Sequence, residues 1–112
     1  MEVSAVAKDT GISARKIRPL VDMVRGKKVD EALTILRFAP TPNARVVAKV
    51  VKSAAANAEN NFQMSPSYLK IVSIFADEAQ TMKRYRPRAR ARTSPILKRS
   101  SHITVIVAEQ EE

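Results

Sequence analysis

The sequence predicts an α+β fold in which three helices pack on a three-stranded antiparallel sheet and a long basic β-hairpin projects from the body. Three amphipathic segments fill most of the first 61 residues, and two β-rich runs, residues 68–76 and 102–108, flank an arginine-rich stretch. A chain of 112 residues that is 45% hydrophobic suits one modest core. We therefore expect a single domain over residues 1–112, with residues 78–101 as the extended hairpin.

The first strand and first helix are predicted from alternation and then from helical spacing. Residues from Glu2 to about Asp9 alternate, and Thr10 with Gly11 supplies a break. Ser13 is an expected N-cap, and a stripe at helical spacing follows at Ile17, Leu20, Val21 and Val24. Gly26 suits a left-handed helix end. Because Pro19 lies within this stripe and lacks an N–H donor, we expect a bent or late-starting helix.

The second and third helices are predicted on either side of Pro40. The second runs from about Val29 to Arg37, with acidic residues at its start and Ala32, Leu33 and Leu36 facing inward. In the third, Thr41 is the expected cap, Pro42 takes the first position and Asn60-Asn61 closes the helix. Its apolar stripe contains Val47, Val50, Val51, Ala54, Ala55 and Ala58. The small alanines favour a helix that lies across the sheet.

The hairpin is predicted from the two β-rich runs, Tyr68–Ala76 and His102–Ala108, if they pair antiparallel. About ten residues then remain for each arm, enough to project on the order of 30 Å. Arginines at alternate positions from Arg84 to Arg92 would share one face of an extended arm. Because Pro87 and Pro95 lack N–H donors, pairing should fade near them, with a tip around residues 88–94.

The charge pattern indicates a polyanionic partner, nucleic acid above all. The chain has 20 Lys and Arg against 11 Asp and Glu, a formal net charge of +9. Residues 82–103 contain no carboxylate and eight cations, Lys83, Arg84, Arg86, Arg88, Arg90, Arg92, Lys98 and Arg99. Arginine dominates this set, and its planar fork suits phosphate groups. The alternative is a disordered charge run that binds any polyanion.

A second basic group surrounds the first predicted helix and its exit. It consists of Arg15, Lys16, Arg18, Arg25, Lys27 and Lys28. Solvated surface is an equally good interpretation of this group, so a nucleic-acid role stays open from the residues alone.

Catalysis, metal binding and membrane insertion find little support. The chain has one histidine, no cysteine and two glycines, so the usual nucleophile, metal and phosphate-loop motifs are missing. Asp77 and Glu78 near His102 form an imaginable acid/base set, although adjacent strand residues point to opposite faces. We expect no enzyme activity, no cofactor, no metal site and no small-molecule substrate. The absence of a long apolar run disfavours a membrane, and the cytoplasm is the default location.

A DNA-binding module is the runner-up from another class. The first two helices would form a helix-turn-helix with Gly26 at the turn, and the basic segment would act as an arm in a groove. Against it, Asp30 and Glu31 stand at the start of the reading helix, where carboxylates repel phosphates.

Four ordered blocks resemble the bacterial-type large ribosomal subunit protein twenty-two family. They are "ISARKIRPLVDMVRGKKVDEAL", "AKVVKSAAANAENN", "FADEAQTMKRYRPRARAR" and "ILKRSSHITVIV". The resemblance implies a structural constituent of the large subunit that binds its rRNA, supports assembly and lines the nascent-peptide exit tunnel with its hairpin. It also implies neighbouring large-subunit proteins and the nascent peptide as partners, in cytoplasmic ribosomes.

The resemblance also assigns residues. It places Lys83, Arg84, Arg86, Arg88, Arg90, Arg92, Lys98, Arg99 and His102 of this sequence against rRNA, and makes Arg15, Lys16, Arg18 and Lys27 anchors of the body. The tunnel-lining tip would hold Arg88, Arg90, Ala91 and Arg92. The chain departs from the family at the tip, where Ala91 stands in place of a common glycine, and at "DEAQ" (residues 77–80), where a Gly-Pro pair is usual. Local backbone geometry there is not carried over.

Overall fold

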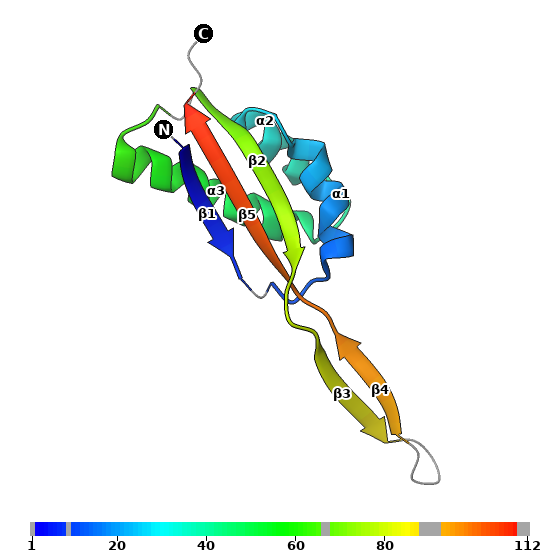
Figure 1. The fold of residues 1–112 in the computed structure, drawn as a ribbon. Helices are drawn as coiled ribbons and strands as arrows, with labels where there is room; N and C mark the ends of the chain where they lie inside the picture. The colour runs from blue at the N-terminus through cyan, green and yellow to red at the C-terminus, as the bar shows by residue number, and fades with distance from the viewer. Residues whose placement is uncertain (1, 9, 66–67, 88–92, 110–112) are drawn as a thin grey trace.

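The computed structural model describes residues 2–8, 10–65, 68–87 and 93–109. Its elements follow the order β1 (Glu2–Ala7), α1 (Ala14–Val24), α2 (Val29–Arg37), α3 (Ala44–Phe62), β2 (Leu69–Glu78), β3 (Met82–Pro87), β4 (Thr93–Lys98) and β5 (Ser101–Glu109). Three helices cover one face of a sheet, and β3 and β4 extend away from it (Figure 1). The α+β prediction with a projecting hairpin is confirmed.

The sheet has the order β1-β5-β2, and both pairings are antiparallel. Its register is continuous except at one irregularity, where Ile71 pairs with Val107 and Ser73 pairs with Ile106. The extra residue, Val72, shifts the alternation by one position. As a result Ile71 before the bulge and Ile74 after it both face the core, although their spacing is odd.

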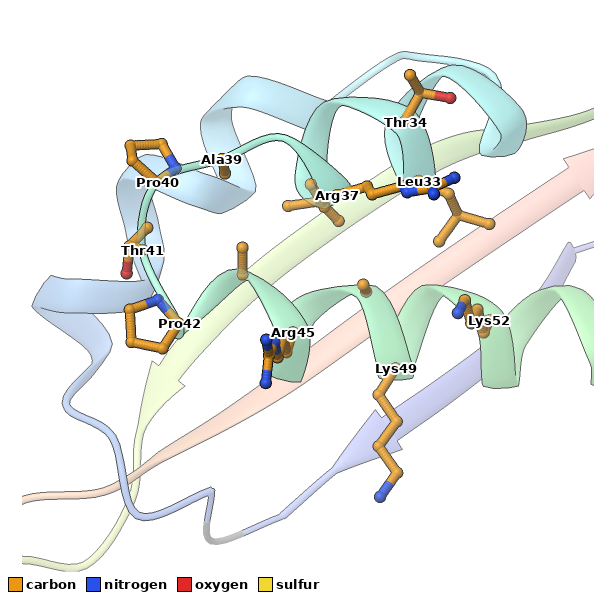
Figure 2. A pocket seen from close by; sticks show the side chains of 13 residues that line it. Leu33, Thr34, Arg37, Ala39, Pro40, Thr41, Pro42, Arg45, Lys49 and Lys52 are labelled. Atoms are coloured by element: carbon orange, nitrogen blue, oxygen red, sulfur yellow. The ribbon is translucent and has the colours of Figure 1, made fainter.

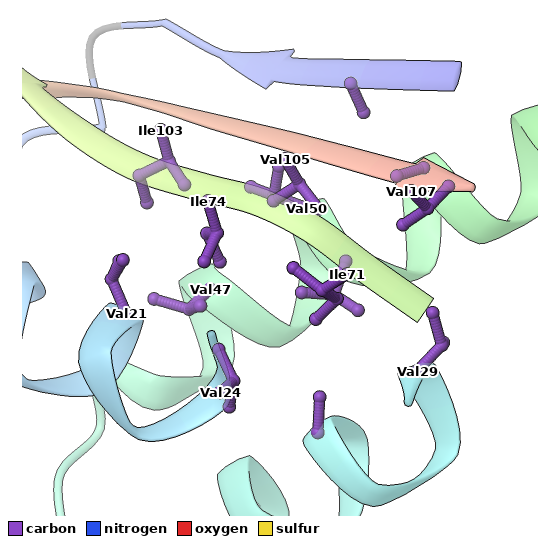
Figure 3. Close-up of a cluster of buried hydrophobic side chains, with 14 of the residues drawn as sticks. Val21, Val24, Val29, Val47, Val50, Ile71, Ile74, Ile103, Val105 and Val107 are labelled. Atoms are coloured by element: carbon purple, nitrogen blue, oxygen red, sulfur yellow. The ribbon is translucent and has the colours of Figure 1, made fainter. Parts of the chain in front are cut away.

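The core lies between this sheet and the helices (Figure 3). α3 packs on β1 and β5, α1 packs on β2, and α2 packs on α3. The stripe predicted for α3 is buried except at Ala55, which is partly buried. In α2, Ala32 and Leu36 are buried and Leu33 is partly buried against the same core. The predicted inward faces of these two helices are therefore confirmed.

α1 begins at Ala14, so the predicted late start is wrong; the alternative, a bend at Pro19, stays a prediction. Ser13 holds the N-cap position, although its side chain makes no capping hydrogen bond. Pro19 lies inside the helix and leaves the carbonyl of Arg15 without its usual donor. Both residues are exposed, so water can satisfy that carbonyl.

The exit of α1 is a type II β-turn. Arg25 has φ −61° and ψ 129°, Gly26 has φ +77°, and the N–H of Lys27 donates to the carbonyl of Val24 at 3.1 Å. The left-handed conformation expected of Gly26 is confirmed, in this turn between two helices.

α3 begins two residues later and ends one residue later than the sequence predicts. The hydroxyl of Thr41 accepts a hydrogen bond from the N–H of Asn43 at 3.2 Å, so it caps the turn that leads into the helix at Ala44. The helix continues past Asn60-Asn61 to Phe62, and Gln63 then ends it in the left-handed region with φ 52°. Asparagine is tolerated in left-handed ends but does not impose one.

β3 and β4 form a separate two-stranded antiparallel sheet, with Met82 opposite Lys98 and Pro87 opposite Thr93. The expectation that pairing fades near Pro95 is wrong, because Pro95 lies within β4 opposite Tyr85. Both strands of a two-stranded ribbon are edges, and a proline whose nitrogen faces outward costs an edge strand no ladder hydrogen bond. The predicted tip, residues 88–94, therefore loses Thr93 and Ser94 to β4, and the remainder lies outside the described residues.

Candidate nucleic-acid interface

The hairpin arms carry the first group of predicted contact residues. Lys83, Arg84 and Arg86 lie in β3, opposite Leu97, Ile96 and Ser94 of β4. Arg84 and Arg86 therefore occupy alternate strand positions, as their spacing predicts, and Lys98 is the last residue of β4. The four residues predicted for the tip, Arg88, Arg90, Ala91 and Arg92, lie outside the described residues. The molecule measures 67 × 27 × 17 Å, and Figure 1 shows the hairpin along its length.

At the root of the hairpin, residues from distant parts of the chain meet. Arg15 at the start of α1 and Arg99 after β4 line one pocket of about 210 Å³, together with Glu78 and Ser100. Both arginines are exposed, and Lys16 follows on the same helix turn. The structure thus brings a member of the second basic group beside the hairpin, which the sequence alone left apart.

The root is fixed by hydrogen bonds to the segment between β1 and α1. The N–H of Thr10 donates to the carbonyl of Ser101 at 3.0 Å, and the Thr10 and Ser101 hydroxyl oxygens lie 2.8 Å apart. The N–H of Gly11 donates to the hydroxyl of Ser100 at 2.9 Å. Ser101 is fully buried, so these bonds satisfy a polar group that would otherwise be costly to bury. They attach the hairpin root to the body.

Arg18 and Arg25 lie along the outer edge of β2. A guanidinium nitrogen of Arg25 donates to the carbonyl of Ile74 at 3.0 Å, and one of Arg18 reaches the carbonyl of Ala76 at 3.5 Å. Arg25 also forms an exposed ion pair with Asp22 at 2.7 Å. These contacts cover edge carbonyls that would otherwise be open to another strand. Arg18, predicted as an anchor for RNA, thus also has a role inside the molecule.

Lys27 and His102 complete the predicted set and lie at different places. The carbonyl of Lys27 accepts a hydrogen bond from the N–H of Ile71 at 3.0 Å, which fixes the position of Lys27. Lys27 follows the C-terminal end of α1, whereas Arg15 lies at the N-terminal end. α1 spans 11 residues, or about 16 Å. His102 is the second residue of β5 and lies opposite Asp77 of β2. The predicted body contacts are therefore spread along α1 rather than gathered at one point.

Sequence reasoning missed a basic groove between α2 and α3. Its cations are Arg37, Arg45, Lys49 and Lys52, all exposed, and Figure 2 shows the last three in a row along α3. Their spacing of four and three residues is the signal that could have revealed them. This signal is easily overlooked, because the cations are interspersed in the sequence with the apolar residues that identify α3 as a core helix.

Metal binding and membrane insertion gain no support from the ranges that the structure describes. These ranges contain no group of three or more His, Cys, Asp or Glu side chains placed to hold a metal ion. In the same ranges, none of the helices has the length and apolar character needed to cross a membrane. The site that the structure does present consists of exposed Arg and Lys side chains on a small α+β body with a basic hairpin. Such an arrangement is typical of proteins that bind nucleic acids.

Comparison with known proteins gives the particular family within that class. The family described as "Ribosomal protein L22p/L17e" matches residues 5–108. A protein of Dehalococcoides mccartyi named "Large ribosomal subunit protein uL22" is 70% identical over 109 residues, covering 97% of this chain and all of that protein. A protein of the same name from Pelotomaculum thermopropionicum is 54% identical over 112 residues, covering 100% of this chain and 99% of its own. The chain belongs to this ribosomal-protein family.

Proposed function

We propose that this chain is a structural component of the large ribosomal subunit that binds large-subunit rRNA, supports assembly of the subunit and lines the peptide exit tunnel with its hairpin. Its partners are the rRNA, neighbouring large-subunit proteins and, at the tunnel wall, the nascent peptide. It acts in the cytoplasm as part of the ribosome, as one domain over residues 1–112, and it has no catalytic role.

The main support for the proposal is a basic two-stranded ribbon that projects from an α+β body. β3 and β4 pair only with each other as a sheet, and a two-stranded ribbon is marginally stable alone in water. Residues 82–103 hold eight cations and no carboxylate, so the ribbon also repels itself. A surrounding polyanion relieves both problems. Folded RNA fits, because it can enclose a narrow ribbon with phosphate groups on every side.

The proposed contacts divide into three sets. In the hairpin, the cations at 83, 84, 86, 88, 90, 92 and 98 contact rRNA phosphates, and residues 88 and 90–92 form the tunnel-lining tip. At the root, Arg99 and His102 contact rRNA beside Arg15 and Lys16. Arg18 and Lys27 extend this contact along α1. Arg15 and Arg99 lie against one pocket, which supports a continuous surface from hairpin to body.

The DNA-binding alternative receives no support from the arrangement of α2. Asp30 and Glu31 lie in its first turn and are exposed, where a reading helix needs groups that attract the duplex. Affinity for folded large-subunit rRNA, compared with affinity for duplex DNA at matched salt, separates the two functions.

The main test changes Arg84, Arg86 and Arg88 together to Ala. Affinity for large-subunit rRNA should fall, and the dependence of log K on log salt should flatten by up to about 0.9 for each phosphate that the variant no longer neutralises. The matched control changes Lys8, Lys28 and Lys70 to Ala, which removes the same charge from residues that are not among the proposed contacts. Equal slopes for both variants would refute phosphate contact by the hairpin.

A further inference from the structure

The groove between α2 and α3 has a charged rim and an apolar floor. It has a volume of about 760 Å³ and opens on the outer side of the helical layer, with the sheet behind it (Figure 2). Leu33, Ala39 and Ala48 in its lining are partly buried, and Pro40 and Pro42 stand in the connection between the two helices. An apolar surface of this kind inside a basic groove suits a ligand that has both charged and apolar parts.

The cations of the rim have no acidic neighbour in the groove among the residues that the structure describes. None of the lining residues in those ranges is Asp or Glu. In the described part of the chain the ion pair between Arg25 and Asp22 is the one salt bridge, and neither of its partners lines this groove. Arg37, Arg45, Lys49 and Lys52 therefore present four uncompensated positive charges to whatever enters. This favours an anionic occupant.

Three of these cations form a row along α3. Arg45, Lys49 and Lys52 fall at i, i+4 and i+7 on α3 and so share one helical face. They span about 10 Å of helix axis at 1.5 Å per residue. This row offers one cation to each of up to three successive phosphates of a strand that runs along α3.

Phe38 supplies a surface on which a base can stack. It follows α2, lies between the groove residues Arg37 and Ala39, and is 76% exposed. The guanidinium of Arg37 lies 5.8 Å from the centre of its ring. Aromatic rings and guanidinium planes are the usual platforms for unpaired bases in proteins that bind single strands.

We propose that this groove binds a single-stranded stretch of RNA. The phosphates lie on Arg45, Lys49 and Lys52, one unstacked base lies on the apolar floor, and a neighbouring base stacks on Phe38. A duplex keeps its bases stacked inside and has no use for such a floor. The inference rests on the proposed function for the source of the strand, the large-subunit rRNA, but the chemistry of the groove is tested separately from the hairpin.

The experiment measures binding of the full-length protein to a 12-nucleotide single-stranded RNA and to an RNA duplex of equal length, by fluorescence anisotropy over a range of KCl. In the variant R45Q/K49Q/K52Q, the log-log salt slope for the single strand should fall by about 2, at about 0.7 per phosphate. The control K8Q/K28Q/K70Q removes the same charge elsewhere and should keep the slope. The swap R45K/K49R/K52R retains charge and should also keep it.

A substitution that leaves the charge unchanged tests the stacking of a base on Phe38. Phe38→Leu should weaken single-strand binding at least about five-fold, since stacking of one base accounts for that much or more, and should leave duplex binding unchanged. Because Phe38 is exposed, this variant keeps the core intact. A photo-crosslinking residue at Ala48, within the groove, gives a second measurement that needs no charge removal and should mark a base of the single strand.

The outcomes separate the two proposals. The groove proposal is overturned if R45Q/K49Q/K52Q binds the single strand as its control does, or if the crosslinker at Ala48 marks no RNA. The hairpin contact is then still judged separately, from the variant of Arg84, Arg86 and Arg88. Tighter binding of an acidic peptide than of the single strand in this groove would also overturn it. If the hairpin variant binds rRNA as well as the unchanged chain does, the proposed function fails there, and the oligonucleotide measurements still decide the groove.

Discussion

The sheet of the body and the hairpin are formed by the same two chain segments, but they differ in what packs against them. In the body, β2 and β5 pair over Leu69–Glu78, a third strand joins β5, and helices cover one face. Beyond residues 79–81 and 99–100 the same two chain segments continue as β3 and β4, which form a sheet of their own. The comparison shows that the described core stabilises the inner half of the ribbon, whereas the outer half continues as a two-stranded sheet.

The boundary between the two parts is defined by specific bonds. Ala79 donates its N–H to the carbonyl of Ser100 at 3.0 Å, one step beyond the last residue pair of β2 and β5. At the same level Thr10 and Gly11 bind Ser101 and Ser100. Body stability should therefore depend strongly on residues before this boundary and weakly on residues beyond it.

The largest effect is expected from the core. Ile74→Ala removes a fully buried side chain from β2 and should lower the free energy of unfolding by about 2–5 kcal/mol. The matched change Ile96→Ala, in β4, should alter it by less than about 0.5 kcal/mol. Urea titration followed by circular dichroism measures both. Similar destabilisation by the two variants would contradict the division between body and hairpin.

The next effect concerns a turn whose glycine has open space around it. Gly26→Ala should lower the free energy of unfolding by about 1–2 kcal/mol, because φ +77° is unfavourable for a residue with a Cβ atom. No heavy atom lies within 4 Å of the added Cβ, so steric overlap does not contribute. Gly26→Asn should cost less, since asparagine tolerates positive φ better. An equal cost for both would point to a cause other than backbone conformation.

A smaller effect is expected at the boundary itself. Ser101→Ala removes the 2.8 Å contact with the Thr10 hydroxyl and should cost about 1 kcal/mol. A double-mutant cycle with Thr10→Val isolates the pair, and the two changes should be non-additive. Additive effects would mean that the hydroxyl pair does not hold the root. Amide exchange at Ala79 should quicken in Ser101→Ala if this contact steadies the hairpin.

The smallest effect on stability is expected at the tip. Replacing residues 88–92 by Asn-Gly joins Pro87 to its partner Thr93 through a two-residue loop that suits an antiparallel pair. The free energy of unfolding should change by less than about 0.5 kcal/mol, and the body should still dock on rRNA. Hydroxyl-radical footprinting of assembled particles should show tunnel protection altered and body protection kept. Loss of body protection would make the hairpin the main anchor.

The sequence predicted those features that depend on pattern over many residues. The bounds of α2 and the buried stripe of α3 follow from periodicity, which many side chains specify together. The pairing of β2 with β5 follows from two β-rich runs on either side of the basic stretch. The left-handed conformation of Gly26 follows from the freedom of glycine at positive φ. The rRNA contacts of the hairpin remain predictions, since Arg88, Arg90 and Arg92 lie outside the described residues and all of the contacts depend on a partner beyond the chain itself.

What could not be predicted depends on single contacts made in three dimensions. The bulge at Val72 restores the core face only once Val107 and Ile106 are in place opposite. Pro95 is tolerated because its strand has one neighbour, which a local rule about proline cannot know. Arg25 belongs to the second basic group, whose role the residues alone leave open, and in the structure it donates to the carbonyl of Ile74, a partner 49 positions away.

The order of strands in the sheet sets a condition on folding. The central strand, β5, is the last of the three to be synthesised, and β1 at the other end of the chain pairs with it, from Glu2 opposite Ala108 to Ala7 opposite Ile103. Until β5 has left the ribosome that makes it, β1 and β2 have no neighbour in common, and loop closure over almost the whole chain comes late. The arginine-rich segment emerges before β5. A newly made chain therefore exposes this dense positive charge before its body can close around the core, and the body closes only when the last strand is in place.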